Sequence, residues 1–182
     1  MEEALELFAR QGFHNTSISQ IAKAAEVSKG LMYNYFASKD DLLEAIVRQE
    51  IDQGEDLMEI LSSTTEDPYE QLQMIVTGAF QMVKTDLKHW KLITMLALQE
   101  EIMQRMSELL RQKTERGLED AVRLFERLGV PDPKGEAYLF GATMDGIFLH
   151  YLSTDPMGIN YPLEQVQKSL LQRYEPYKSI NQ

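Results

Sequence analysis

The sequence of 182 residues contains no cysteine, and this absence removes a first group of functions. Without a thiol the chain has no disulfide, no thiolate metal site and no cysteine nucleophile. No run of apolar residues approaches the roughly 18 to 20 that a membrane-spanning helix needs, so we expect no membrane partner. Together these absences favour a soluble protein of the reducing cytoplasm.

Motifs of the common enzyme classes are also missing. The ten glycines form no Gly-x-Gly pair, and no Gly-Lys-Ser/Thr or Gly-x-Ser-x-Gly sequence occurs. Asp86-x-x-His89 could place two ligands on one helix face, but a single pair of this kind is a common accident. We therefore expect no catalytic residues, no metal site, no cofactor and no enzymatic role.

Residues 16–39 carry the most specific pattern of the chain. Ser17 followed by Gln20 is a capping box, which predicts the start of a helix. Ser28 is a second cap. Residues 24–27 (Ala-Ala-Glu-Val) form a tight turn between the two predicted helices. Two short helices joined in this way are typical of a helix-turn-helix, whose second helix enters the DNA major groove.

At these residues the chain resembles the TetR family of bacterial transcription regulators. The matching positions are Gly12-Phe13, Thr16-Ser17-Ile18, Ile21-Ala22, Val27-Ser28-Lys29-Gly30, Tyr33, Tyr35-Phe36 and Ser38-Lys39. The resemblance covers about the first 48 residues. It implies an all-α fold of about nine helices, in which a three-helix DNA-binding domain (residues 1–48, helix-turn-helix about 17–36) precedes a larger helical ligand-binding and dimerisation domain (residues 49–182).

The net charge of −11 argues at first sight against a nucleic-acid binder. Residues 1–48 carry five basic and seven acidic residues, whereas residues 49–182 carry 13 basic and 22 acidic residues. Within residues 13–39 three lysines face a single acid, Glu26. Glu26 departs from the family pattern, which commonly has Gly at this turn, and a left-handed backbone there would cost about 1 kcal/mol.

The resemblance also implies which residues meet DNA. The expected contacts are Thr16, Ser17, Ser28, Lys29, Gly30, Leu31, Tyr33, Asn34, Tyr35 and Lys39. Asn34 offers a bidentate amide to adenine, and Leu31 an apolar surface to a thymine methyl group. Lys39, at the start of the next helix, is predicted to clamp a phosphate. Two alternatives stay open: Ser17 as a cap with no DNA role, and Tyr35 as a partly structural residue.

The predicted second domain is rich in methionine and aromatic residues, which adapt to varied apolar shapes. The candidate ligand-binding residues are Phe80, Trp90, Met103, Phe125 and Met144, although each is also explained as ordinary bundle core. Gly141 and Phe148 are the candidate dimer-interface residues, on helices expected at about 135–152 and 163–177. Asp145 is expected to be a buried polar exception on the first of these helices.

These observations predict a homodimeric repressor that binds a double-stranded DNA operator. A small-molecule effector, more probable as a hydrophobic neutral or cationic compound than as an anion, would release the operator. The alternative is a helical small-molecule binding protein without specific DNA recognition.

Overall fold

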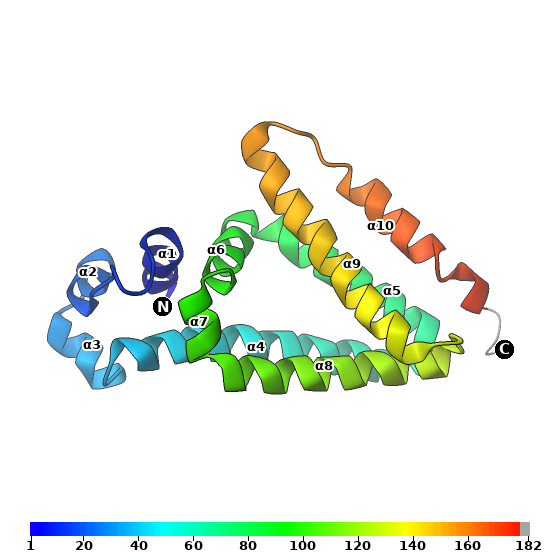
Figure 1. Ribbon diagram of the computed structural model, residues 1–182, viewed down its shortest axis with the longest axis horizontal. Coiled ribbons are helices and arrows are strands. Elements are labelled where there is room, and N and C mark those ends of the chain that lie inside the picture. Colours follow the sequence, from blue (N-terminus) through cyan, green and yellow to red (C-terminus); the bar gives the residue numbers. More distant parts are fainter. Residues whose placement is uncertain (179–182) are drawn as a thin grey trace. The chain divides into compact units, whose positions relative to one another are not determined.

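The computed structural model describes residues 1–178, apart from the side chains of residues 53–59, 61–63 and 155. This part of the chain is helical and contains no strand (Figure 1). Its α-helices are α1 (Glu2–Gln11), α2 (Ile18–Ala24), α3 (Lys29–Tyr35), α4 (Lys39–Thr64), α5 (Pro68–Thr85), α6 (Leu87–Ala97), α7 (Glu100–Arg105), α8 (Ser107–Leu128), α9 (Pro133–Thr154) and α10 (Leu163–Gln172). No described helix combines the length and apolarity that crossing a bilayer requires.

The all-α prediction is confirmed, with ten helices in the described chain where about nine were expected. Residues 100–128 form two of these helices, α7 and α8, which are divided at Met106. Capping side chains fix other boundaries as the sequence predicts. Asp67, for example, accepts hydrogen bonds from the backbone N–H groups of Tyr69 (2.7 Å) and Glu70 (3.2 Å), while Pro68 opens α5.

The chain divides into two compact units, and neither is one continuous stretch of sequence. The first unit combines residues 1–55 with residues 88–111, and the second combines residues 56–87 with residues 112–182. The predicted DNA-binding domain, residues 1–48, therefore shares its unit with α6 and α7. This grouping was not anticipated from the sequence, because the TetR-like pattern ends near residue 48.

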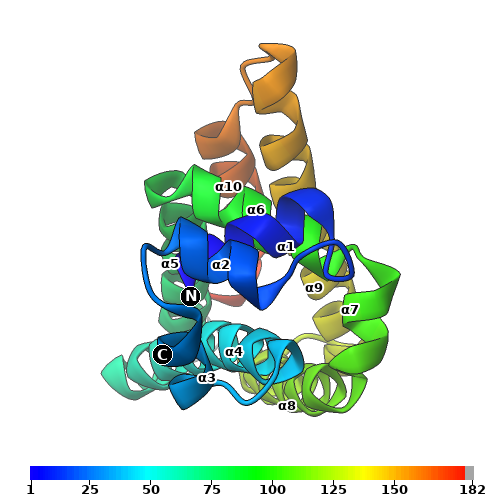
Figure 2. The same cartoon turned by 90° about the vertical axis from the view of Figure 1, so that its left-hand side faces the viewer.

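The core of the first unit explains why α6 and α7 belong to it. Phe8 of α1 and Phe13 are buried with their ring centroids 5.2 Å apart. Leu92 and Leu96 of α6 and Ile102 of α7 are buried in the same cluster. Figure 2 shows α6 beside α1 in this unit. Burial of this apolar surface is the main force that holds the segment from α6 to α7 against the helices of the N-terminus.

The second unit is built around a separate aromatic core. Phe125 of α8 contacts Phe140 of α9 (5.6 Å between centroids) and stacks on Tyr174 (5.7 Å). Tyr174 is 2% exposed, and its hydroxyl donates a 2.6 Å hydrogen bond to Glu136. Burial and this hydrogen bond raise the pKa of Tyr174 above its ordinary value. Asp145 corrects one prediction: its side chain is exposed in this chain, since it lies on the outer face of α9.

Candidate nucleic-acid interface

The start of α2 has the capping box that the sequence predicts. The hydroxyl of Ser17 accepts a hydrogen bond from the backbone N–H of Gln20 (3.2 Å). In return the side-chain oxygen of Gln20 accepts one from the backbone N–H of Ser17 (2.7 Å). Buried Ile18 and Ile21 then point into the core of the first unit. The box therefore fixes both the first turn of α2 and the face that α2 presents to the core.

The turn between α2 and α3 is a Schellman motif. The backbone N–H of Val27 donates to the carbonyl of Ala22 (2.9 Å), and that of Glu26 donates to Lys23 (3.3 Å). The residue between the helix end and Val27 must take a left-handed conformation in this motif, and Glu26 does so with φ = 55°. The left-handed turn considered for Glu26 in the sequence is therefore present, and it directs the chain into α3.

Helix α3 presents most of its surface to solvent. Ser28 caps it by accepting a hydrogen bond from the backbone N–H of Leu31 (3.0 Å). Met32 and Phe36, four residues apart, are partly buried against the core of the first unit. The positions turned away from the core are exposed: Lys29, Gly30, Leu31 (42%), Tyr33 (48%), Asn34 and Tyr35 (75%). Met32 and Phe36 pack α3 against the core of the first unit. The polar and aromatic side chains of its other faces remain accessible.

Two details of α3 bear on contact with a ligand as large as DNA. The Lys29 ammonium lies 5.7 Å from the centroid of the Tyr33 ring, so a cation and an aromatic hydroxyl are presented together. A Cβ placed on Gly30 would meet no atom closer than the Ser28 hydroxyl at 3.9 Å. Packing within the described chain therefore does not require glycine at position 30.

Thr16 and Lys39 have hydrogen-bond partners within the described chain. The hydroxyl of Thr16 is buried (1% exposed) and donates to the carbonyl of Gly12 (2.8 Å). The Lys39 ammonium donates to the carbonyls of Phe13 (2.6 Å) and Thr16 (2.8 Å) and lies 4.2 Å from the Phe13 ring centroid. Both side chains therefore hold the loop between α1 and α2. Thr16 uses its one hydroxyl donor there, and Lys39 uses two of its three ammonium donors. Their contacts with DNA stay predictions.

Polar contacts also attach the segment from α6 to α7 to the N-terminal helices. At one end Lys88 pairs with Glu6 (2.9 Å), and this hydrogen bond and charge lower the pKa of Glu6. At the other end the amide of Gln99 donates to the carbonyl of Phe8 near the end of α1 (2.9 Å). The Phe8 carbonyl also accepts from the backbone N–H of Gly12 (3.1 Å), so Gln99 adds a second donor at the end of α1 from a distant part of the sequence.

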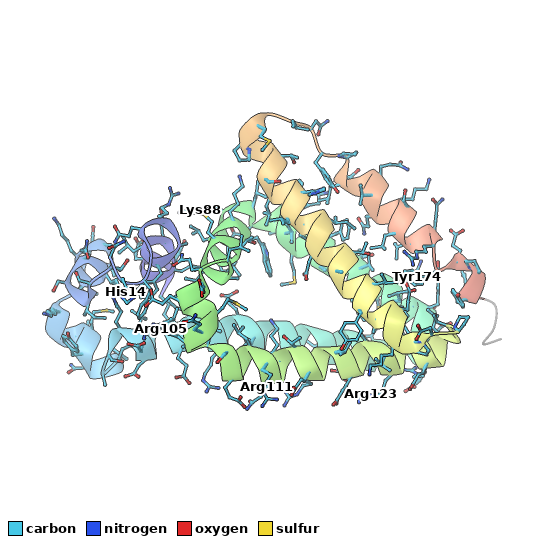
Figure 3. The ribbon with its side chains drawn as sticks, viewed as in Figure 1. His14, Lys88, Arg105, Arg111, Arg123 and Tyr174 are labelled. Carbon is cyan, nitrogen blue, oxygen red and sulfur yellow. The ribbon has the colours of Figure 1, made fainter. Side chains whose placement is uncertain are left out.

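Arg105 makes the densest set of these contacts. Its guanidinium pairs with Asp40 at the start of α4 and with Glu101 (2.9 Å), and lies 4.6 Å from the Phe13 ring centroid. Glu101 also contacts His14 (2.9 Å). Figure 3 labels His14, in the loop after α1, and Arg105, at the end of α7. Sequence reasoning missed Arg105 and Gln99 because nothing local marks a contact about 65 to 90 residues away.

The five candidate ligand residues fall in different units. Phe80, Phe125 and Met144 share the buried cluster of the second unit, where Phe80 also contacts the Phe148 ring (5.2 Å). Trp90, partly buried, and Met103, 46% exposed, belong to the first unit. The structure therefore brings three of the five together.

A hollow of about 310 Å³ lies elsewhere in the second unit. Most residues around it have polar or charged side chains, unlike the apolar site expected from the sequence. They are Tyr69, Gln73, Glu164, Gln167, Lys168, Leu171, Gln172 and Glu175. Lys84 pairs with Glu164 beside it (2.9 Å).

The candidate dimer residues also separate. Gly141 is exposed, with no atom within 4 Å of an added Cβ, whereas Phe148 is partly buried against Phe80 inside the second unit. The outer face of α9 carries large exposed apolar residues, namely Tyr138 (58%), Leu139 (56%) and Leu149 (47%).

Comparison with known proteins identifies the family of the chain. Residues 1–46 match the family described as bacterial regulatory proteins, tetR family. The HTH-type transcriptional regulator BetI 1 of Chromohalobacter salexigens is 30% identical over 166 residues, which cover 88% of this chain and 80% of that protein. The chain belongs to the TetR family. It is a ligand-responsive, DNA-binding transcriptional regulator.

Two further matches of this TetR-family chain are regulators from Bacillus subtilis. The fatty acid metabolism regulator protein of Bacillus subtilis is 28% identical over 114 residues, which cover 61% of this chain and 58% of that protein. The structure of FadR from Bacillus subtilis in complex with stearoyl-CoA has the same fold. Its TM-score is 0.75 at 22% identity, over 95% of this chain and 94% of that one.

Proposed function

We propose that α3 reads an operator through Lys29, Gly30, Leu31, Tyr33, Asn34 and Tyr35, with Ser17 and Ser28 at the flanking phosphates. The observation that carries this proposal is the exposure of these α3 side chains on a helix anchored only through Met32 and Phe36. Lys29 and Asn34 supply the donors that read guanine and adenine edges. Gly30 lets the DNA backbone approach closely, which is a reason for glycine where internal packing gives none.

Operator binding is tested by gel shift on DNA flanking the gene, with an unrelated duplex as competitor. We expect sequence-dependent binding that Tyr33→Ala weakens without unfolding the protein. Lys29→Ala should cost about 1–3 kcal/mol at one base pair if it reads a base. Lys134→Ala is the matched control, because Lys134 is an exposed lysine of α9 outside the DNA-binding residues 1–48, which we call the reading head. Equal, salt-sensitive binding to every duplex would instead favour a small-molecule binding protein without specific DNA recognition.

We also propose that the protein acts as a homodimer through the outer face of α9. Tyr138, Leu139 and Leu149 are exposed apolar residues on this face, which also carries Ala142, Gly146 and the exposed carboxylate of Asp145. Such a surface is typical of an association site, since burying it removes apolar area from water. Two reading heads would then meet successive major grooves about 34 Å apart.

Sedimentation of a charged variant tests this interface. Leu149→Glu should shift the protein toward monomer at micromolar concentration, because it places a carboxylate in a surface that would be dehydrated. Leu149 is preferable to Phe148, whose replacement would also disturb the contact with Phe80. Lys113→Glu, on an exposed position of α8, is the control and should remain dimeric. An intact Leu149→Glu dimer would move the interface to another surface.

The effector that we propose is a hydrophobic compound that enters the second unit near Phe80, Phe125 and Met144. Methionine and aromatic side chains repack easily around apolar ligands, which supports this location. The stearoyl-CoA bound to Bacillus subtilis FadR supports a ligand with a long apolar part. Because Phe80 and Phe125 are fully buried, binding of this compound has to open the core. The compound would act by changing the shape of the protein, without being chemically converted.

Fluorescence of Trp90, the only tryptophan, reports on the first unit, so it detects a change that a ligand in the second unit transmits there. Titration with a long-chain acyl-CoA, a free long-chain fatty acid and a hydrophobic cation should shift its emission, and the same compounds should release DNA unchanged themselves. Met144→Ala should weaken this response, whereas Met157→Ala, at a position 69% exposed and outside the cluster, should not. Compounds that perturb Trp90 without changing operator affinity would contradict the coupling.

A further inference from the structure

Glu26 combines two unfavourable features at the centre of the reading head. Its backbone has φ = 55°, and the other residues with positive φ in the described chain are the glycines Gly12, Gly129 and Gly158. The chain thus supplies glycine at each of these other left-handed positions and a side chain at this one. A non-glycine residue in this conformation is strained, and strain of this kind persists mainly where it serves a function.

The charge of Glu26 is the second unfavourable feature. It is the single acidic residue between residues 13 and 39, which also hold Lys23, Lys29 and Lys39. Its side chain is exposed and makes no hydrogen bond or ion pair with the described residues. The backbone hydrogen bonds of the Schellman motif hold the left-handed turn, but no ion pair with the described residues offsets the charge of the carboxylate.

The position of Glu26 puts its carboxylate close to bound DNA. Glu26 stands two residues before Ser28, the cap of α3, and two residues of chain span at most about 7 Å. The first residues of a recognition helix are those that meet base edges and phosphates. The carboxylate therefore lies within about one Debye length, roughly 10 Å at 0.1 M salt, of the phosphates beside α3.

We propose that Glu26 limits DNA affinity by repelling the phosphate backbone, so that the reading head dissociates from DNA that lacks the operator sequence. This inference rests on the proposed reading of DNA by α3. Phosphate neutralisation drives sequence-independent binding, and a carboxylate beside the phosphates opposes it. The repulsion acts equally on any duplex. Its effect is to lower all affinities and leave residence on DNA to the base contacts of Lys29, Tyr33 and Asn34.

Three substitutions at this position separate charge from strain. Glu26→Gln removes the charge and keeps the side chain, Glu26→Asp keeps the charge, and Glu26→Gly removes charge and strain together. Glu126→Gln, at an exposed position of α8, is the control for net charge. Affinity is measured for the operator and for an unrelated duplex over a series of salt concentrations, with thermal melting to confirm folding.

We expect Glu26→Gln and Glu26→Gly to tighten binding to both duplexes by the same factor, about two- to fivefold per head at 0.1 M salt. Their salt dependence should be steeper, while Glu26→Asp and Glu126→Gln should behave as the wild type. Unchanged affinity of Glu26→Gln for both duplexes would overturn the proposal. So would weaker binding confined to one operator base pair, which would make Glu26 a reader of cytosine. Failure of DNA reading by α3 is distinguishable, because Tyr33→Ala would then also bind as the wild type.

Discussion

Replacement of Lys39 by methionine separates a structural role from a DNA-binding role. Methionine retains most of the apolar length of lysine and removes the ammonium group. The variant loses two charge-assisted hydrogen bonds, to the carbonyls of Phe13 and Thr16, and the contact of the cation with the Phe13 ring. Hydrogen bonds to charged groups contribute roughly 1.5–3 kcal/mol each, and a partly exposed cation–π contact about 0.5–1 kcal/mol.

The two carbonyls are only partly buried, so water can replace some of the lost bonding in Lys39→Met. We therefore expect a loss of about 2–3 kcal/mol in the free energy of unfolding, which is less than the summed contributions. For a chain of this length that corresponds to a fall of roughly 5 to 10 °C in melting temperature. Urea denaturation followed by circular dichroism measures the first quantity, and thermal melting the second.

Operator binding by the same variant gives the second measurement. A side chain engaged within the protein releases no counterion on binding, so Lys39→Met should leave the salt dependence of operator affinity unchanged. Lys29→Met is the matched control with the opposite result: unchanged stability and a salt slope smaller by about 1. An unchanged urea midpoint together with a reduced slope in Lys39→Met would refute the structural role and restore the phosphate clamp predicted from the sequence.

Three other substitutions test the stability of particular contacts. Glu26→Gly should raise the free energy of unfolding by about 1 kcal/mol, whereas Glu26→Ala should not, because alanine retains the left-handed strain. Gln99→Leu should cost about 1 kcal/mol and speed amide exchange at the end of α1, where the Phe8 carbonyl loses one of its two donors; unchanged exchange would argue against the distant cap. Tyr174→Phe should cost about 1–2 kcal/mol near pH 7 by removing the bond to Glu136. Because the pKa of Tyr174 is raised in the folded state, wild-type stability falls as pH rises above about 10, and this fall should be smaller in Tyr174→Phe denaturation curves.

Sequence patterns predict the reading head well because its determinants are local. The box of Ser17 and Gln20 and the cap at Ser28 each involve residues three apart, and the structure has both as predicted. The pairing of Met32 and Phe36 on the inner face of α3 follows in the same way from helical spacing.

The sequence is less informative where a side chain meets a distant part of the chain. Lys39 bonds to carbonyls 23 and 26 residues away, and its position at a helix start gave no sign of these contacts. The ligand residues show the same limit, since methionine and aromatic content does not reveal which unit a residue joins. Trp90 and Met103 lie in the first unit because α6 and α7 pack with the N-terminal helices there.

The discontinuity of the first unit has a consequence for protein engineering. A chimera that joins residues 1–48 to the effector domain of another regulator would leave out Leu92, Leu96 and Ile102, and with them a wall of the hydrophobic core around Phe8. It would also leave the end of α1 without Gln99 and the start of α4 without Arg105. During synthesis, likewise, the reading head cannot complete its core until the ribosome has passed residue 106. A transplantable module has to carry residues 88–111 along with the helices that read DNA.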